Sequence, residues 1–312
     1  MRAISLKPSV LAGIAIQPEN IHLVQLQQTR NAFLVAKVCR YSLPTEVFSD
    51  GKITSFLELQ HKLAEVVERE GLHDARAAIC VAANQVKMQN ITVPSGLSEK
   101  DIEAEIRILI QRALPAKNDA LAIDFHKSAT DHPEEVKVFF AAARLEYIQR
   151  YQECLHAVGL KTAMIDIDVF ALLRAARYAL RDIWMEHEKI CVLYVGDNYA
   201  AIAAQHAGQM LFHQQWDGGS HNSHTMTCWQ WLEWCCHTWR HVEIGSVAIG
   251  GSSEYIYQAA AVIAAKWSCK IYEPDPFQSM LGATMLDKSV LNDCPSAFLL
   301  ACGLAMRKVQ PW

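Results

Sequence analysis

The same pattern of alternating apolar and polar residues, typical of consecutive β-strands, occurs twice in the sequence. Residues 13–26 alternate apolar and polar side chains with a break at Pro18, and residues 33–38 continue the alternation. The pattern restarts later in three further stretches, residues 190–195, 200–206 and 209–216. A period of two is typical of β-strands, and short polar breaks are typical of hairpins. Two β-β-β starts, each followed by helical segments, predict an α/β fold built by internal duplication.

Helical periodicity follows the first start. Phe56, Leu63, Val66 and Val67 form one apolar face that ends at Gly71, a residue suited to a helix carboxyl cap. Residues 77–82 then have the composition of a buried strand. The first segment therefore predicts the order β-β-β-α-β.

A compact α/β subdomain is predicted between residues 84 and 160. Ser98 and Asp101 form a capping box, which places a helix from Ser98 to a point before Pro115. Strands are expected at residues 86–93, 120–125 and 136–142, the last two paired, and a further helix ends at Gly159. A strand at residues 163–167 and a helix at 169–180 lead back to the second start.

Composition excludes several classes of protein. A chain of 312 residues with 51% apolar and 20% charged residues is an ordinary folded protein of about two domains. Its 33 acidic and 29 basic residues give no broad attraction for nucleic acid, and we interpret Arg174, Arg177 and Arg181 as a solvated helix face. No apolar run approaches the ~20 residues of a membrane span, and ten cysteines in apolar contexts favour a reducing cytosol.

Several motifs in order resemble the PilM family, which lies close to the division protein FtsA in the actin superfamily. Residues 13–26 resemble its opening phosphate hairpin, and residues 93–103, beginning Val-Pro-Ser-Gly-Leu-Ser, resemble its subdomain 1C. Residues 166–174 and the closing Ala-Cys-Gly-Leu-Ala-Met-Arg at 301–307 extend the likeness. FtsA and the secretion protein GspL are the alternatives, but both continue into membrane-binding helices, whereas this sequence stops at Trp312.

The resemblance implies an actin-like, bilobed α/β fold with an inserted 1C subdomain and a reduced 2B region. The expected parts are residues 1–83 for the first part of subdomain 1A, 84–160 for 1C, 161–188 for the return of 1A, and 189–312 for the second lobe. In that lobe the 2B region is shortened around residues 219–245.

Family resemblance also points to a degraded nucleotide site. In the family the first hairpin carries an acidic residue, a second glycine and a lysine, where this chain has Ala15, Gln17 and His22. In the second hairpin Tyr194 stands at the acidic position, Gly196 is retained, and Asp197 is a possible substitute.

The vestigial nucleotide-binding set is therefore expected to be Gly13, Gly196, Asp197, Gly250, Gly251 and Ser252. The paired glycines either allow close approach of a nucleotide or serve only the geometry of a strand-to-helix turn. Both interpretations stay open. No catalytic residue is assigned, and any ATP with Mg is expected to bind weakly.

A stretch rich in His, Cys and Trp lies between residues 219 and 245. His221, His224, Cys228, Cys235, Cys236, His237 and His241 include plausible zinc ligands, but their spacing lacks an ordered metal-site pattern. The interleaved tryptophans at 229, 231, 234 and 239 favour a packed or partner-facing amphipathic helix. No metal site is assigned.

The resemblance implies a cytoplasmic scaffold of a type IV pilus or DNA-uptake (competence) machine, peripheral to the inner membrane through its partners. Such proteins bind the amino-terminal peptide of PilN in a groove between subdomains 1A and 1C, and they link the PilN–PilO complex to motor ATPases. The individual contact residues are not assigned. The alternative function is an active actin-like ATPase that uses Asp197, Glu19, Asp166 and Asp168 as its carboxylates.

Overall fold

The computed structural model describes residues 10–30, 32–49, 52–113, 120–130, 132–184, 188–218, 226–286, 288–291 and 294–307. The described chain divides into two compact units, of which the second is Ala83–Glu153. The first unit comprises the rest of the described chain. The subdomain boundaries expected from sequence stay a prediction.

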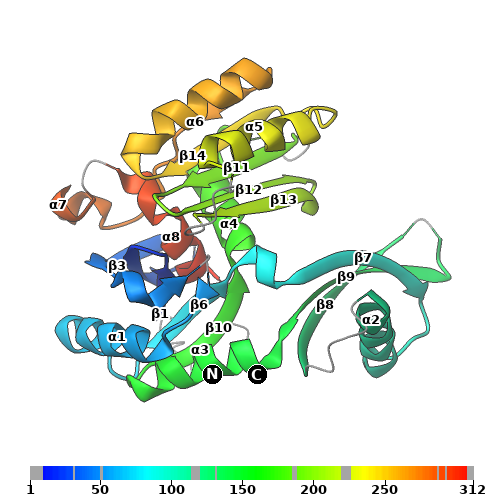
Figure 1. Cartoon of the computed structure of the whole chain (residues 1–312), viewed down its shortest axis with the longest axis horizontal. Helices are drawn as coiled ribbons and strands as arrows, with labels where there is room; N and C mark the ends of the chain where they lie inside the picture. Colours follow the sequence, from blue (N-terminus) through cyan, green and yellow to red (C-terminus); the bar gives the residue numbers. More distant parts are fainter. Residues whose placement is uncertain are drawn as a thin grey trace, which may run out of the picture. The chain divides into compact units, whose positions relative to one another are not determined.

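Two five-stranded sheets with the same topology form the first unit (Figure 1). The first sheet has the order β10 (Lys161–Ile167), β6 (Arg76–Val81), β1 (Val10–Ile16), β2 (Asn20–Gln28) and β3 (Phe33–Ser42). The second has the order β13 (Gln209–Asp217), β12 (Tyr199–His206), β11 (Ile190–Val195), β14 (Ser246–Gly251) and β15 (Lys270–Tyr272). In each sheet the first three strands along the chain form antiparallel pairs. The two later strands run parallel to the first of these three. This shared order confirms the predicted duplication.

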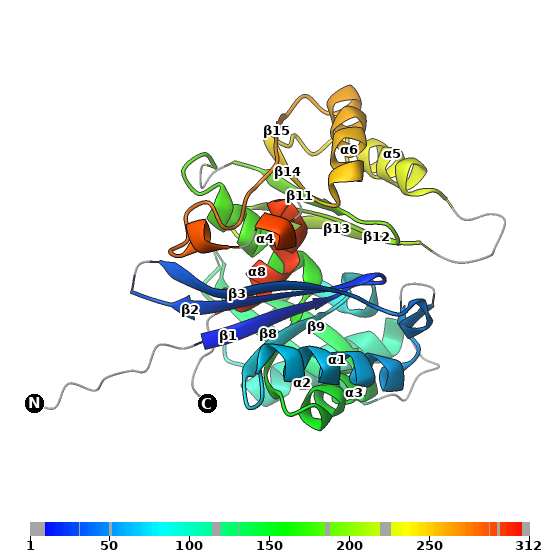
Figure 2. The same cartoon turned by 90° about the vertical axis from the view of Figure 1, so that its left-hand side faces the viewer.

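Helices α4 (Asp168–Ala179) and α8 (Leu299–Ala305) lie between the two sheets (Figure 2). Glycine makes this close packing possible. A Cβ added at Gly13 would come 2.1 Å from the carbonyl oxygen of Ala301, and one at Gly303 would come 1.9 Å from that of Ala171. The small residues of the closing motif therefore set how closely α8 approaches β1 and α4.

Helix α1 (Phe56–Glu70) ends at Gly71 as predicted, and the structure adds a cap at Ser55. The Ser55 side chain accepts a hydrogen bond from the Glu58 amide, and Gly71 ends the helix in the left-handed region at φ 62°. Leu59, Leu63, Val66 and Val67 form its buried face. The short elements of the first unit are η1 (Thr45–Val47), β4 (Phe48–Ser49), β5 (Lys52–Ile53), η3 (Ala283–Met285), α7 (Lys288–Leu291) and η4 (Pro295–Phe298).

Helices α5 (Cys228–Thr238) and α6 (Ser253–Lys266) pack against each other, and α6 also contacts β11 and β14 of the second sheet. Trp239, at the end of α5, stacks on Phe212 of β13 with ring centroids 4.2 Å apart. The predicted amphipathic helix is therefore confirmed, and it carries both buried and exposed aromatic side chains, with Trp231 buried and Trp234 exposed.

The second unit is a three-stranded antiparallel sheet with one helix against it. Its strand order is β7 (Lys87–Pro94), β9 (Glu135–Arg144) and β8 (Leu121–Ala129), preceded by η2 (Ala83–Gln85). Helix α2 (Glu99–Ala113) buries Ile102, Ile106 and Ile110 against Val138 and Phe140.

The predicted capping box of α2 is confirmed. The Asp101 amide donates to Oγ of Ser98, and the Ser98 amide donates to Oδ2 of Asp101. The helix ends within the described residues, whereas Pro115 lies outside them.

Helix α3 (Leu145–Ala157) follows the sheet. Within the described ranges, no helix combines the length and apolar character that crossing a bilayer requires.

Candidate functional site

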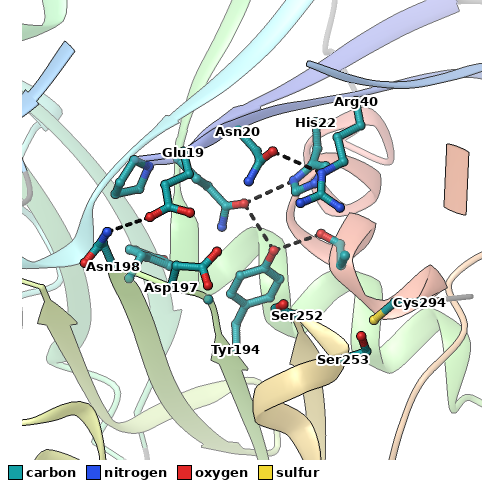
Figure 3. Close-up of a pocket in the computed structure, with 15 residues that line it drawn as sticks. Glu19, Asn20, His22, Arg40, Tyr194, Asp197, Asn198, Ser252, Ser253 and Cys294 are labelled. Carbon is teal, nitrogen blue, oxygen red and sulfur yellow. Dashed lines mark hydrogen bonds between the residues drawn. The ribbon is translucent and has the colours of Figure 1, made fainter. Parts of the chain in front are cut away.

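A cleft lies between the two duplicated hairpins of the first unit (Figure 3). Its walls include the β1–β2 turn at Gln17 to Glu19 and the β11–β12 turn at Gly196 to Asn198. Each turn closes on itself through a backbone bond, from the Gln17 amide to Asn20 at 2.9 Å and from the Gly196 amide to Tyr199 at 2.8 Å. The remaining lining residues are Asn20, His22, Arg40, Tyr194, Tyr199, Ser252, Ser253, Cys294 and Ala297.

A buried chain of polar groups joins the two hairpins at the base of this cleft. The Tyr194 hydroxyl donates to the Ala297 carbonyl at 2.9 Å, with Oε1 of Gln17 as a second acceptor at 3.1 Å. Nδ1 of His22 lies 3.1 Å from the same Gln17 oxygen. All three side chains are buried. Hydrogen bonds therefore connect Gln17 and His22 of the first hairpin with Tyr194 of the second.

His22 is neutral in this environment. It is 4% exposed, its ring meets Phe298 edge-on at 4.8 Å, and Nε2 has no hydrogen-bond partner in the described chain. Burial, together with repulsion from Arg40, lowers the pKa of His22 from 6.5 to about 3. His22 therefore supplies no positive charge to the cleft at neutral pH.

Carboxyl groups meet at the mouth of the cleft. Glu19 lies in the first turn and Asp197 in the second, and burial together with the neighbouring Asp197 carboxyl group raises the pKa of Glu19. Nδ2 of Asn198 donates to Oε1 of Glu19 at 2.7 Å. The Asp197 carboxyl group also raises the pKa of Tyr255 on α6 to about 12.

The structure separates the residues of the predicted nucleotide set. Gly196, Asp197 and Ser252 line the cleft. Gly13 instead lies against α8, as described above. A Cβ at Gly250 would come 2.2 Å from Cδ1 of Leu299, and Gly251, at φ 125°, would bring one to 1.9 Å from the Val195 oxygen. The protein itself covers both glycines, and their contact with a nucleotide stays a prediction.

Asp166 is engaged in an ion pair away from the cleft. Arg174 places Nη2 2.8 Å from Oδ2 of Asp166 and donates from Nη1 to the Gly303 carbonyl at 2.6 Å. The interpretation of Arg174 as part of a solvated helix face was therefore wrong, because this side chain ties α4 to β10 and α8 through largely buried contacts.

Asp168 is also engaged within the protein. The Tyr199 hydroxyl donates to its Oδ2 at 2.8 Å, and the Val169 amide donates to its Oδ1 at 2.7 Å. Neither Asp166 nor Asp168 lines the cleft. The hydrogen bond from Tyr199 to Asp168 is a second link between the β11–β12 hairpin and the first half of the unit.

The sequence reasoning missed these links, along with the contributions of Arg40 and Tyr255. It treated Gln17, His22 and Tyr194 as separate losses. Their joint occurrence was the available signal, since three bulky polar residues at positions that the resemblance assigns to one site can form hydrogen bonds with one another.

The predicted His and Cys stretch is only partly described. His221 and His224 lie outside the described residues. Among those described, no group of three or more His, Cys, Asp or Glu side chains is placed to hold a metal ion. Burial raises the pKa values of Cys228 and Cys236 to about 11, which keeps both thiols protonated at neutral pH.

The hairpin end of the cleft does not fit a Mg-nucleotide phosphate group. Tyr194 and Gln17 fill its base, and Glu19 and Asp197 present acidic groups at its mouth. Among the described residues lining the cleft, Arg40 is the only Lys or Arg, and its Nε is bound to Oδ1 of Asn20 at 3.0 Å. Phosphate binding in this fold class depends on backbone amides and cations, and the side chains at this mouth are mainly acidic, with Arg40 as the single Lys or Arg among the described lining residues.

Comparison with known proteins agrees with the fold. Residues 13–230 match the family model for type IV pilus assembly protein PilM. A PilM–PilN type IV pilus biogenesis complex matches with TM-score 0.78 and 17% identity, over 96% of this chain and 99% of that one. This likeness shows a shared fold.

Two remoter structures match with a TM-score of 0.49. One is a Bacteroides thetaiotaomicron protein with an actin-like ATPase fold and unknown function, at 10% identity over 91% of this chain and 97% of that chain. The other is ethanolamine utilization protein EutJ from Carboxydothermus hydrogenoformans, at 11% identity over 96% and 90%.

Proposed function

This chain belongs to the PilM family of type IV pilus assembly proteins, with the family's actin-like α/β fold, and we propose on that premise that it is a non-catalytic assembly scaffold. It binds the cytoplasmic amino-terminal peptide of a PilN-type membrane protein. It thereby links a PilN–PilO complex to the motor ATPases of the machine. We place it in the cytoplasm, held at the inner membrane by these partners.

The closed base of the cleft supports the proposal that the protein is not an efficient ATPase. The Tyr194 to Gln17 contact, the neutral His22 and the facing carboxyl groups replace the charged apparatus that phosphoryl transfer needs. Positioning and electrostatic stabilisation supply nearly all the catalysis in such reactions. We therefore propose at most weak binding of Mg-ATP, through the side of the cleft that Ser252 and Ser253 line.

Peptide binding is the positive part of the proposal. Its support is the family membership together with the second unit, a sheet whose outer strands β7 and β8 each pair only with β9 in the described chain. An extended peptide gains backbone hydrogen bonds at a sheet edge and apolar contacts from its alternate side chains. The second unit is therefore the part of the chain to test.

Removal of this sheet is the experiment. Lys87 on β7 pairs with Ala142 on β9, so a short Gly-Ser linker can replace residues 88–141 across the spacing of two neighbouring strands. The variant keeps α3, whose Leu155 is buried. We expect circular dichroism to show a folded protein and fluorescence anisotropy to show at least a tenfold loss of affinity for a labelled PilN-type amino-terminal peptide.

A surface variant provides the control. Trp234→Ala removes an exposed side chain on α5 of the first unit, and it should leave the peptide affinity unchanged. Unchanged affinity in a folded variant that lacks residues 88–141 would refute the proposed role of the second unit in peptide binding.

A further inference from the structure

Two side-chain hydrogen bonds cross the cleft from one duplicated hairpin to the other. At the mouth, Nδ2 of Asn198 donates to Oε1 of Glu19 at 2.7 Å (Figure 3). At the base, the Tyr194 hydroxyl lies 3.1 Å from Oε1 of Gln17. Both bonds connect the first half of the first unit, which holds the first sheet, with the second half, which holds the second sheet.

A third hydrogen bond joins the second hairpin to α4. The Tyr199 hydroxyl donates at 2.8 Å to Oδ2 of Asp168, the first residue of that helix, directly after β10 of the first sheet. Both side chains are buried, as are Tyr194 and Gln17. Burial raises the pKa of both tyrosines above the usual range, so their hydroxyls keep the proton that they donate.

Helix α4 is shared by the two halves. It contacts β6 and β10 of the first sheet and β11 and β12 of the second. Halves that pack on a common helix can move relative to each other by hinge or shear motions, which in many proteins close a cleft around a ligand. In this chain such a motion would have to break side-chain bonds between the hairpins.

We propose that these three hydrogen bonds form an interlock that holds the two halves of the first unit in one fixed arrangement. The protein's own side chains then take the bridging position that a ligand occupies in proteins whose halves close around it. This inference does not depend on the proposed scaffold function, because it concerns the motion of the two halves and not partner binding.

The two tyrosine bonds contribute more to the interlock than the bond at the mouth. An opening too small to admit water would leave the buried hydroxyls of Tyr194 and Tyr199 and their acceptors without partners, which is costly. Asn198 is exposed, so water can replace its bond to Glu19 at little cost. The tyrosines are therefore the residues to change.

Tyr194→Phe and Tyr199→Phe each remove one hydroxyl from the interlock and keep the aromatic ring. Tyr41→Phe is the matched control. The Tyr41 hydroxyl donates to Oε1 of Glu70, but this bond joins β3 to α1 within the first half. All three variants lose the same atom, and only the first two lose a link between the halves.

The measurement is hydrogen exchange at neutral pH of two backbone amides in the first half. The Gln17 amide donates to the Asn20 carbonyl within the β1–β2 turn, and the Val169 amide donates to Oδ1 of Asp168. The first reporter lies beside the Tyr194 bond and the second beside the Tyr199 bond.

An interlock predicts that each tyrosine variant changes both reporters. We expect Tyr199→Phe to speed exchange of the Gln17 amide at least tenfold, and Tyr194→Phe to do the same at Val169. Tyr41→Phe should leave exchange of the Val169 amide unchanged. Circular dichroism verifies that the variants are folded, and each tyrosine variant tests the proposal by itself.

Two results would overturn the interlock. Faster exchange only at the reporter beside the deleted hydroxyl would mean that the bonds act independently. Unchanged exchange at both reporters would mean that the bonds do not restrain the two halves.

Discussion

The Tyr194 hydroxyl lies 3.1 Å from Oε1 of Gln17, although 177 positions separate the two residues in the sequence. The contact joins the second β-hairpin to the first at the base of the cleft. Gln17 also meets His22, and Tyr194 donates to Ala297. These side chains close the base of the cleft, so their replacement should have measurable consequences.

Tyr194→Phe should lower the free energy of unfolding by about 1–3 kcal/mol. The change removes a buried donor and leaves the Ala297 carbonyl and the Gln17 amide oxygen with fewer partners. Urea denaturation measures the effect. Tyr257→Phe removes the same atom from a side chain that is 80% exposed, and it should change stability by less than about 0.5 kcal/mol. Equal effects of the two variants would contradict the importance of the buried network.

ATP hydrolysis by the purified protein should be no faster than that by Asp197→Ala. Loss of a single preorganised donor costs about 100- to 1000-fold in other enzymes, and Ala15, Tyr194 and His22 stand where the family resemblance predicts two acidic residues and a cation. Calorimetry for nucleotide binding and a phosphate-release assay at matched magnesium concentration provide the test. Steady turnover that disappears in Asp197→Ala would favour the alternative, an active ATPase.

Acid should destabilise the protein partly through His22. Its pKa is about 3 in the folded state and near 6.5 in the unfolded chain, so the unfolded chain binds the proton more tightly between these values. The contribution of neutral His22 to the free energy of unfolding is fully present above pH 6.5 and is lost as the pH falls toward 3. His22→Leu should flatten the decline of unfolding free energy in that window, whereas His126→Leu, at an exposed position, should leave its slope unchanged.

Gly303→Ala should destabilise the first unit by about 1–3 kcal/mol or more. The added Cβ would come 1.9 Å from the backbone oxygen of Ala171, so α4 and α8 would have to move apart. Gly96→Ala is the matched control, because its Cβ would meet nothing within 4 Å. Thermal unfolding compares the two, and an unchanged midpoint for Gly303→Ala would show that the two helices can separate without cost.

The sequence by itself determined the elements and most of their ends. Gly71 ends α1 in the left-handed region, and Ser98 with Asp101 begins α2, as the sequence predicts. Both signals are local, because a cap involves residues within about one helical turn. The duplicated order of strands was likewise readable, since alternation along the chain reports which segments are strands.

Only the tertiary structure decided how the altered cleft residues are used. The sequence shows that Gln17, His22 and Tyr194 differ from the family pattern, but the choice of hydrogen-bond partner depends on how closely two sheets approach through α4 and α8. The same holds for Arg174, whose helical spacing resembled a solvated face until Asp166 and Gly303 were brought beside it. Contacts between distant segments depend on the three-dimensional packing of the whole unit, which local periodicity does not encode.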